Sequence, residues 1–147
     1  MLKSEPEVFS IDDLQRKKVE GWDGVRNYQA RNYLKSMRKG DQAFFYHSRE
    51  KPPGIVGICK VVRTAYPDDT ASNPRSPYYD PRHTAENPVW FRVDVEFVEK
   101  FSRLLSLDEL KATRGLEQMV VTRKGSRLSV QPVTPKEWKT VLKLLES

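Results

Sequence analysis

The sequence VWFRVDVEFVEKF, residues 89–101, alternates apolar and charged side chains over most of its length. A period of two is typical of a β-strand with one buried face, because successive side chains point to opposite sides of the sheet. The charged side of this strand would carry Arg92, Asp94 and Glu96. The apolar side would carry Phe91, Val93, Val95 and Phe97. The stretch therefore predicts a half-buried strand, around which the rest of the chain must be arranged.

Further strands are predicted on both sides of this stretch. Residues 42–48 and 55–65 are rich in aromatic and β-branched side chains, and Pro52-Pro53-Gly54 marks a turn between them. Two shorter apolar stretches flank Arg123-Lys124-Gly125-Ser126, and we expect them to form a hairpin: residues 119–122 and 127–130.

Short helices are predicted from their capping residues, whose side chains can accept a free backbone N–H at a helix start. The expected caps are Ser10, Asn27, Ser106 and Thr134. The second helix should run over residues 28–38, and the fourth has proline in its first turn and Glu137 at the capping-box position. Residues 1–147 are thus expected to form a single α+β domain, a mixed β-barrel with short flanking α-helices.

Residues 67–88 show neither the helical nor the strand period and contain five prolines. A loop of this length in a small domain is usually functional or disordered. The adjacent Tyr78 and Tyr79 have apolar surface to bury. We therefore expect this loop to fold onto the domain, where a tyrosine either forms a wall of a binding pocket or only pins the loop down.

The charge composition favours a polyanionic partner. Lys and Arg number 26 against 20 Asp and Glu, and the pI is near 9.5. Nucleic acid is the commonest partner of such a basic domain. Cys59, His47 and His83 are too few for a disulfide framework or a multi-cysteine zinc site, so no metal or cofactor is expected. No apolar stretch predicts a membrane span or a signal core, and we expect a cytoplasmic monomer that does not bind membranes.

Several runs spread along the chain match one family. The most specific is Trp22-Asp23-Gly24-Val25-Arg26-Asn27-Tyr28-Gln29-Ala30-Arg31-Asn32. Others are Lys3-Ser4-Glu5-Pro6, Phe44-Phe45-Tyr46-His47-Ser48, Tyr79-Asp80-Pro81 and Arg127-Leu128-Ser129-Val130. In this order they resemble the EVE domain, a branch of the PUA-like superfamily. Family members usually carry an aromatic-rich strand before the Lys-Ser-Glu-Pro run, of which Met1-Leu2 remains here. Either the first strand is shortened or the start site is placed late.

The resemblance implies a PUA-like fold and a non-enzymatic reader of nucleic acid. The EVE family is associated with recognition of modified nucleobases, and its fold is similar to that of the YTH domain, which cages methyladenine. In that relative a cage tryptophan stands about where Trp22 stands here. Stacking on a base contributes roughly 1–3 kcal/mol. We therefore expect Trp22 to hold a modified or flipped base of RNA or DNA, in a strand that is single or locally opened.

A base held in this way also needs polar groups at its edge and cations at its phosphates. For the base pocket, the resemblance and the positions near strand and helix ends select eleven residues: Lys3, Ser4, Glu5, Trp22, Asn27, Tyr28, Tyr46, His47, Ser48, Tyr79 and Ser129. For the phosphates they select Arg26, Arg31, Lys35 and Arg127.

Other interpretations stay open from sequence alone. The main alternative is an enzyme acting on a nucleotide or modified nucleoside, with Glu5, His47 or Asp23 as acid or base. Adjacent His47 and Ser48 do not suit a catalytic relay, because neighbouring strand residues point to opposite faces. Trp22 could instead cap the barrel end, His47 could be a structural histidine, and the helix cations could be merely solvated. A protein-interaction module would need an exposed apolar patch that the sequence does not indicate.

Overall fold

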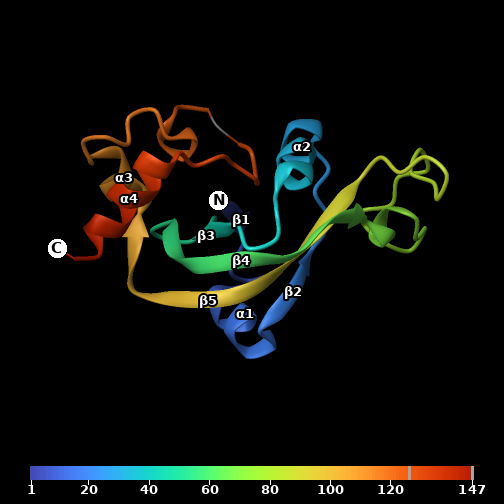
Figure 1. Ribbon diagram of the computed structural model, residues 1–147, viewed down its shortest axis with the longest axis horizontal. Helices are drawn as coiled ribbons and strands as arrows, with labels where there is room; N and C mark the ends of the chain where they lie inside the picture. The colour runs from blue at the N-terminus through green and yellow to red at the C-terminus, as the bar shows by residue number, and fades with distance from the viewer. Residues whose placement is uncertain (126, 147) are drawn as a thin grey trace.

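The molecule is organised by a five-stranded sheet with the strand order β1-β3-β4-β5-β2 (Figure 1). The computed structural model describes residues 1–125 and 127–146. The strands are β1 (Leu2–Ser4), β2 (Val19–Trp22), β3 (Gln42–His47), β4 (Gly54–Pro67) and β5 (Phe91–Ser106). β1 pairs with β3 in parallel, and the other pairs are antiparallel. β1 and β2 are therefore the two edge strands.

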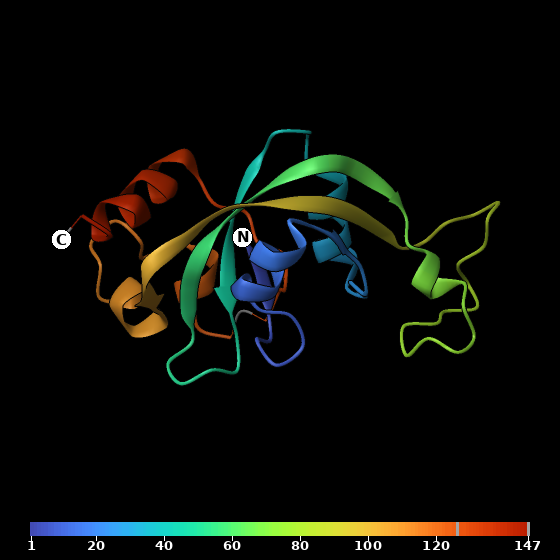
Figure 2. The same ribbon diagram turned by 90° about the horizontal axis from the view of Figure 1, so that it is seen from below.

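The alternating stretch forms β5 as predicted, and Val93 and Val95 are fully buried. The ladder between β4 and β5 slips its register at several points, for example between Ile58 and Cys59. Such bulges bend a strand and increase its twist. As a result both strands curve strongly along their length, as the green and gold ribbons of Figure 2 show.

Two hydrophobic cores form on opposite faces of the sheet. Along β3, Phe45 belongs to the first core, whereas Phe44 and Tyr46 belong to the second. The first core also receives side chains from the helices α1 (Ile11–Lys17) and α2 (Tyr28–Ser36). The second receives side chains from α3 (Leu107–Lys111) and α4 (Pro135–Leu144). β3 is buried on both faces, which explains its continuous apolar run.

All four expected helix caps are confirmed. Ser10, Asn27, Ser106 and Thr134 each accept a backbone N–H in the first turn of their helix. Reciprocal capping boxes form at Ser10 and at Thr134. The second helix ends at Ser36, two residues before the predicted end at Arg38.

The predicted hairpin around residues 123–126 is wrong. Val120–Thr122 form the 3₁₀ helix η2, because Leu116 and Met119 are buried at helical spacing and the Thr122 hydroxyl donates to the carbonyls of both. Residues 127–130 run beside β1 instead, where the Lys3 N–H donates to the Ser129 carbonyl at 2.9 Å. Ser126, part of the predicted turn, lies outside the described residues.

The fold is α+β as predicted, but the expected barrel is not closed. β1 and β2 stand at opposite ends of the strand order and do not pair with each other. The outer edge of β1 is already bonded to residues 129–131, and β2 is only four residues long. Neither edge strand therefore offers the other a free ladder of sufficient length.

The long loop between β4 and β5 lies at the opposite end of the molecule from the C-terminal helices (Figure 1). It contains the 3₁₀ helix η1 (Asp69–Ala71) and the buried His83, whose Nδ1 accepts the backbone N–H groups of Val89 and Trp90. These bonds give the loop a defined path. Among the described residues, none of the helices has the length and apolar character that crossing a membrane requires.

Candidate functional site

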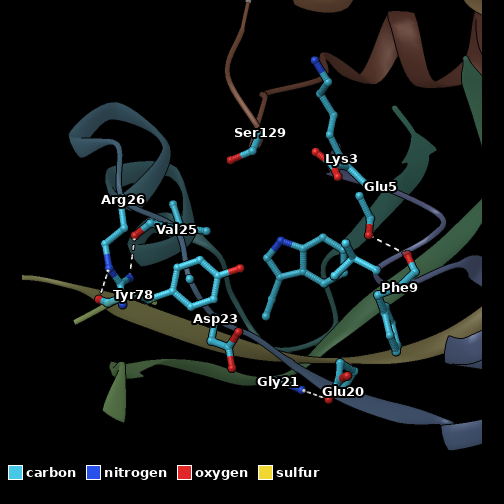
Figure 3. A pocket seen from close by; sticks show the side chains of 14 residues that line it. Lys3, Glu5, Phe9, Glu20, Gly21, Asp23, Val25, Arg26, Tyr78 and Ser129 are labelled. Carbon is cyan, nitrogen blue, oxygen red and sulfur yellow. Dashed lines mark hydrogen bonds between the residues drawn. The ribbon is translucent and has the colours of Figure 1, made fainter. Parts of the chain in front are cut away.

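A cavity of about 520 Å³ opens between the two edge strands of the sheet (Figure 3). β1 contributes Lys3 and Ser4 to its lining, and β2 contributes Gly21 and Trp22. The cavity lies where a closed barrel would have joined β1 to β2. Its volume is in the range of small-molecule sites.

Trp22 is the largest buried side chain of this lining. It is the last residue of β2, is 9 % exposed, and its ring meets Phe45 edge-on at 5.6 Å. The short strand containing Gly21 pairs with β5 and carries Trp22 into the first core. No hydrogen bond joins its indole N–H to another described residue, and the indole nitrogen is not completely buried. The N–H is therefore an unused donor open to the cavity.

Tyr78 reaches the opposite part of the lining from the long loop, and Figure 3 shows its ring projecting into the cavity. The ring lies over Gly24, where a Cβ atom would stand 2.9 Å from Tyr78 Cζ. Gly24 also has a φ of +75°, a conformation that favours glycine. This glycine is thus required both by the turn and by the tyrosine. The neighbouring Tyr79, which we had selected for the pocket, is 43 % exposed and lies outside the cavity.

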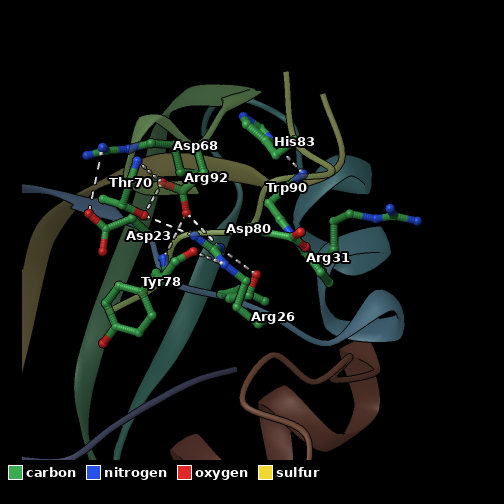
Figure 4. Close-up of polar contacts among 12 residues, drawn as sticks. Asp23, Arg26, Arg31, Asp68, Thr70, Tyr78, Asp80, His83, Trp90 and Arg92 are labelled. Carbon is green, nitrogen blue, oxygen red and sulfur yellow. Dashed lines mark hydrogen bonds and ion pairs between the residues drawn. The ribbon is translucent and has the colours of Figure 1, made fainter. Parts of the chain in front are cut away.

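The buried Asp68 ties the start of the long loop to the cavity wall (Figure 4). Its Oδ2 accepts from the Gly24 N–H at 2.9 Å and from Arg26 Nη1 at 3.0 Å. Its Oδ1 accepts from the backbone N–H and the hydroxyl of Thr70. Burial would raise the pKa of Asp68, but the hydrogen bonds from Thr70, Gly24 and Arg26 outweigh it and hold the pKa below its ordinary value. The charged carboxylate fixes the turn that follows Trp22.

Ionised groups of both signs line the cavity. The cations are Lys3 and Arg26, and the carboxylates are Glu5, Glu20 and Asp23. Burial lowers the pKa of Lys3, whose ammonium lies 5.6 Å from the centre of the Tyr46 ring. Arg26 is already neutralised by Asp68. The lining therefore offers more carboxylate than free cation.

Asp23 has the least satisfied of these carboxylates. Burial raises its pKa, the neighbouring Asp68 and Glu20 raise it further, and Arg92 opposes them. Arg92 Nη1 lies 3.7 Å away, and no hydrogen bond from a described residue reaches Asp23. Glu5 and Glu20 have closer cationic partners, Arg49 at 3.2 Å and Lys17 at 3.0 Å. Asp23 can therefore accept a hydrogen bond from a ligand.

The EVE domain family model matches residues 1–144 of this chain. The chain belongs to the EVE domain family. Thymocyte nuclear protein 1 of Rattus norvegicus is 47 % identical to it, over 100 % of this chain and 73 % of the relative. The similarity therefore covers most of the length of that protein.

Solved structures of EVE relatives are similar over nearly the whole chain. A crystal structure of a Pseudomonas syringae protein is 53 % identical with a TM-score of 0.94, covering 98 % of this chain and 97 % of that one. The crystal structure of human THYN1 protein in complex with 5-methylcytosine-containing DNA is 46 % identical with a TM-score of 0.93, covering 99 % and 96 %. The human protein in that complex binds DNA with a modified base.

Five of the eleven residues selected for the base pocket line the cavity of this EVE domain: Lys3, Ser4, Glu5, Trp22 and Ser129. The others lie elsewhere. Asn27 caps α2, Tyr46 is in the second core, and Ser48 donates its backbone N–H to the Ser4 carbonyl. Tyr28 is exposed and stacks on Trp90 with a centroid distance of 5.0 Å. A position near a strand end did not ensure a place in the cavity. Successive side chains of β3 point alternately into the two cores, which lie on opposite faces of the sheet.

His47 is buried outside the cavity, and both of its ring nitrogens have partners. Nε2 accepts the Ile11 N–H at 3.0 Å, and Nδ1 lies 2.8 Å from Glu50 Oε2. The imidazole thereby holds the start of α1 against the end of β3. Of the three groups in the enzymatic alternative, Glu5 and Asp23 line the cavity and His47 does not. Among the described residues, no cluster of three or more His, Cys, Asp or Glu could hold a metal ion.

The four selected cations are not equally free. Arg26 lines the cavity but bonds to Asp68, Thr70 and the Tyr78 carbonyl. Arg31 donates to the Val89 carbonyl at 3.0 Å. Lys35 and Arg127 are exposed, and the Lys35 ammonium lies 4.6 Å from the centre of the Phe91 ring. Their contact with phosphates remains a prediction.

Sequence reasoning missed Asp68, Glu20 and the choice of Tyr78 over Tyr79. Asp68 carried one readable signal, because an aspartate two residues before a threonine is typical of a turn cap, and it does cap η1. Its bonds to Gly24 and Arg26 join positions more than forty residues away, which no local pattern could indicate.

Proposed function

We propose that this EVE domain binds nucleic acid and holds one modified base, 5-methylcytosine or a close analogue, in the cavity between β1 and β2. The observation that carries this proposal is Trp22, a buried ring with an unused N–H donor facing a cavity of about 520 Å³. Support comes from human THYN1, whose structure in complex with 5-methylcytosine-containing DNA has a TM-score of 0.93 to this chain.

Aromatic rings supply the stacking that an extruded base requires. Trp22, Tyr78 and Phe9 belong to the lining. An extruded base loses its neighbours in the strand, so ring contacts in the pocket must replace them. Each such stack contributes about 1–3 kcal/mol and tolerates any base, so stacking provides affinity and the polar groups provide selection.

The polar groups of the cavity suit the edge of cytosine. Cytosine carries an exocyclic amino donor where thymine carries a carbonyl acceptor. The carboxylate of Asp23 can accept a hydrogen bond from that amino group. The Trp22 N–H can donate one to the ring nitrogen or the carbonyl oxygen of the base. A thymine would instead bring its carbonyl against Asp23, leaving two acceptors opposed and unpaired, which is costly in a partly buried site. The proposal therefore includes selection for amino-bearing pyrimidines.

Replacing Asp23 by asparagine is expected to weaken binding of an oligonucleotide with one 5-methylcytosine by about ten-fold, because a hydrogen bond to a charged group contributes about 1.5–3 kcal/mol. Binding of the same oligonucleotide with thymine at that position should fall less or rise. Fluorescence-anisotropy titrations of both probes measure this ratio. Glu99→Gln, which removes a charge from an exposed position of β5, is the matched control. An unchanged ratio in Asp23→Asn would remove Asp23 from base selection.

Phosphate contacts are tested through salt dependence. If Lys35 or Arg127 contacts a phosphate, its replacement by alanine should weaken binding evenly across sequences. It should also reduce the magnitude of the slope of log K against log salt by about 0.7 on a single strand or 0.9 on a duplex. Lys111→Ala, on α3 and outside the cavity lining, removes the same charge as a control. A slope equal to that of the unmodified protein would mean that the residue does not touch the backbone.

The proposed role is binding without chemistry on the base. The enzymatic alternative would require an acid–base pair in the cavity. Glu5 and Asp23 line it, whereas the His47 ring lies outside it and is occupied by Ile11 and Glu50. Measured turnover of a nucleoside or oligonucleotide that is lost in Asp23→Asn would replace the reader by that alternative.

A further inference from the structure

A series of stacked aromatic and guanidinium groups leads from the cavity to the exposed start of α2 (Figure 4). The Arg26 guanidinium lies 5.6 Å from the ring centre of Tyr78, which lines the cavity, and 5.5 Å from that of Trp90. Trp90 in turn stacks on Tyr28 with a centroid distance of 5.0 Å and an interplanar angle of 22°. Each step spans less than 6 Å, so Tyr28 is three contacts away from the cavity wall.

The inner end of this series is rigid. Trp90 is 3 % exposed, and its indole N–H donates to Asp80 Oδ2 at 2.8 Å. Arg26 is bonded to Asp68, to Thr70 and to the Tyr78 carbonyl. The Tyr28 ring therefore rests on a surface that the fold already holds in place, which keeps the entropic cost of stacking a further ring low.

The outer face of Tyr28 is open. The side chain is 49 % exposed although one of its faces lies on Trp90. Arg31 lies 4.9 Å from the Tyr28 ring centre and 6.0 Å from the Trp90 ring centre. The two ring centres are 5.0 Å apart, so a guanidinium only 6.0 Å from Trp90 lies beside the stack rather than beyond Tyr28. A guanidinium on the outer face of Tyr28 would stand much farther from Trp90.

The surroundings of this open ring favour an anionic chain with flat groups. Arg31 lies at its edge, and Lys35 follows one turn later on α2. Arg82, which pairs with Asp80 at 2.8 Å, lies close enough to Tyr28 for their interaction to raise the pKa of Arg82 further. An open aromatic face with cations at its rim is the arrangement on which single-stranded nucleic acid stacks its bases.

We propose that Tyr28 is the stacking platform for the nucleotide next to the base held in the cavity. The proposal rests on the proposed function, since it concerns the same nucleic acid, but it assigns a second binding site on a different surface. The held base leaves the strand, and its neighbour stacks outside on Tyr28. A strand held at two places also has a defined direction across the domain.

The test uses the whole protein and a single-stranded DNA oligonucleotide with one 5-methylcytosine. Two derivatives carry an abasic spacer in place of the nucleotide on its 5′ or its 3′ side. The unmodified protein is expected to bind one of these two derivatives about ten-fold more weakly than the intact strand, and the other about equally well. Tyr28→Ala is expected to bind the intact strand about ten-fold more weakly and to show no further loss with the sensitive derivative. Tyr28→Phe, which keeps the ring, should behave like the unmodified protein.

Each outcome separates this inference from the proposed function. If the unmodified protein binds none of the strands, the proposed function fails and the platform fails with it. If it binds them but tolerates both abasic derivatives, or if Tyr28→Ala binds all three strands as the unmodified protein does, only the platform is overturned. The platform would also be overturned if Tyr28→Ala lost the same factor of affinity, relative to the unmodified protein, on all three strands. Such a result would show that the ring does not act through the neighbouring base. Thermal midpoints within a few degrees of each other verify that the variants are folded.

Discussion

Trp22→Ala is expected to lose about 3–5 kcal/mol of its free energy of unfolding, as large aromatic-to-alanine changes in cores do. It is also expected to bind a 5-methylcytosine oligonucleotide at least about ten-fold more weakly. Both effects follow from one position, because the ring is 9 % exposed in the first core and also lines the cavity. A ring that only lined a pocket would cost less stability, because part of its surface would already be in water, but Trp22 is buried in the first core. Chemical denaturation and titration of the folded fraction measure the two effects.

Two further variants separate the roles of Trp22. Trp22→Phe keeps an aromatic ring but loses the N–H donor, so it should remain folded and still bind about five- to ten-fold more weakly, equivalent to one hydrogen bond. Trp138→Ala is the stability control, because Trp138 stacks on Phe44 at 3.9 Å in the second core. It should destabilise the domain while its folded fraction binds normally. If Trp22→Phe binds as tightly as the unmodified protein, the indole N–H has no ligand partner.

Asp68→Ala is expected to cost about 3–5 kcal/mol of stability, because removing one partner of a buried ion pair leaves the other charge uncompensated. Here the partner is Arg26, whose side chain is 21 % exposed, and the Gly24 N–H also loses its acceptor. The turn after Trp22 should loosen as a result, which would weaken ligand binding too. Asp69→Ala is the matched control. Asp69 forms an ion pair with Arg92, but its side chain is 82 % exposed, so its loss should change stability by less than about 1 kcal/mol.

The same carboxylate makes stability depend on pH. The folded-state pKa of Asp68 lies below the ordinary value of 3.8, so its contribution is fully present above that value and is lost as the pH falls through the folded pKa. The stability difference between the unmodified protein and Asp68→Asn should therefore be largest near neutral pH and should shrink below about pH 4. Thermal melts of both proteins at several pH values measure this difference. A difference that stays constant down to about pH 2 would show that Asp68 does not titrate in this range.

Local signals in the sequence were sufficient for most of the elements. The caps at Ser10, Asn27, Ser106 and Thr134 were readable because a cap bonds to residues only two or three positions away. The strand from Phe91 was readable because its alternation reports one buried face. The run from Trp22 to Asn32 was specific enough to indicate the EVE family. The hairpin at residues 119–130 failed because apolar composition alone does not distinguish a short strand from a 3₁₀ turn packed on a core.

The candidate site depended on contacts between distant parts of the chain. Sequence alone selected Lys3 and Trp22, but only the sheet order shows that β1 and β2 are edge strands and that the cavity lies between them. Local pattern did not distinguish Tyr78 from Tyr79, and the bond of Arg26 to the Tyr78 carbonyl helps to bring Tyr78 over Gly24. Local patterns in the chain established the family, most of the elements and the chemical types of side chain available. Which of these side chains meet depended on sheet order and loop path, because both are set by packing between residues that are far apart in the chain.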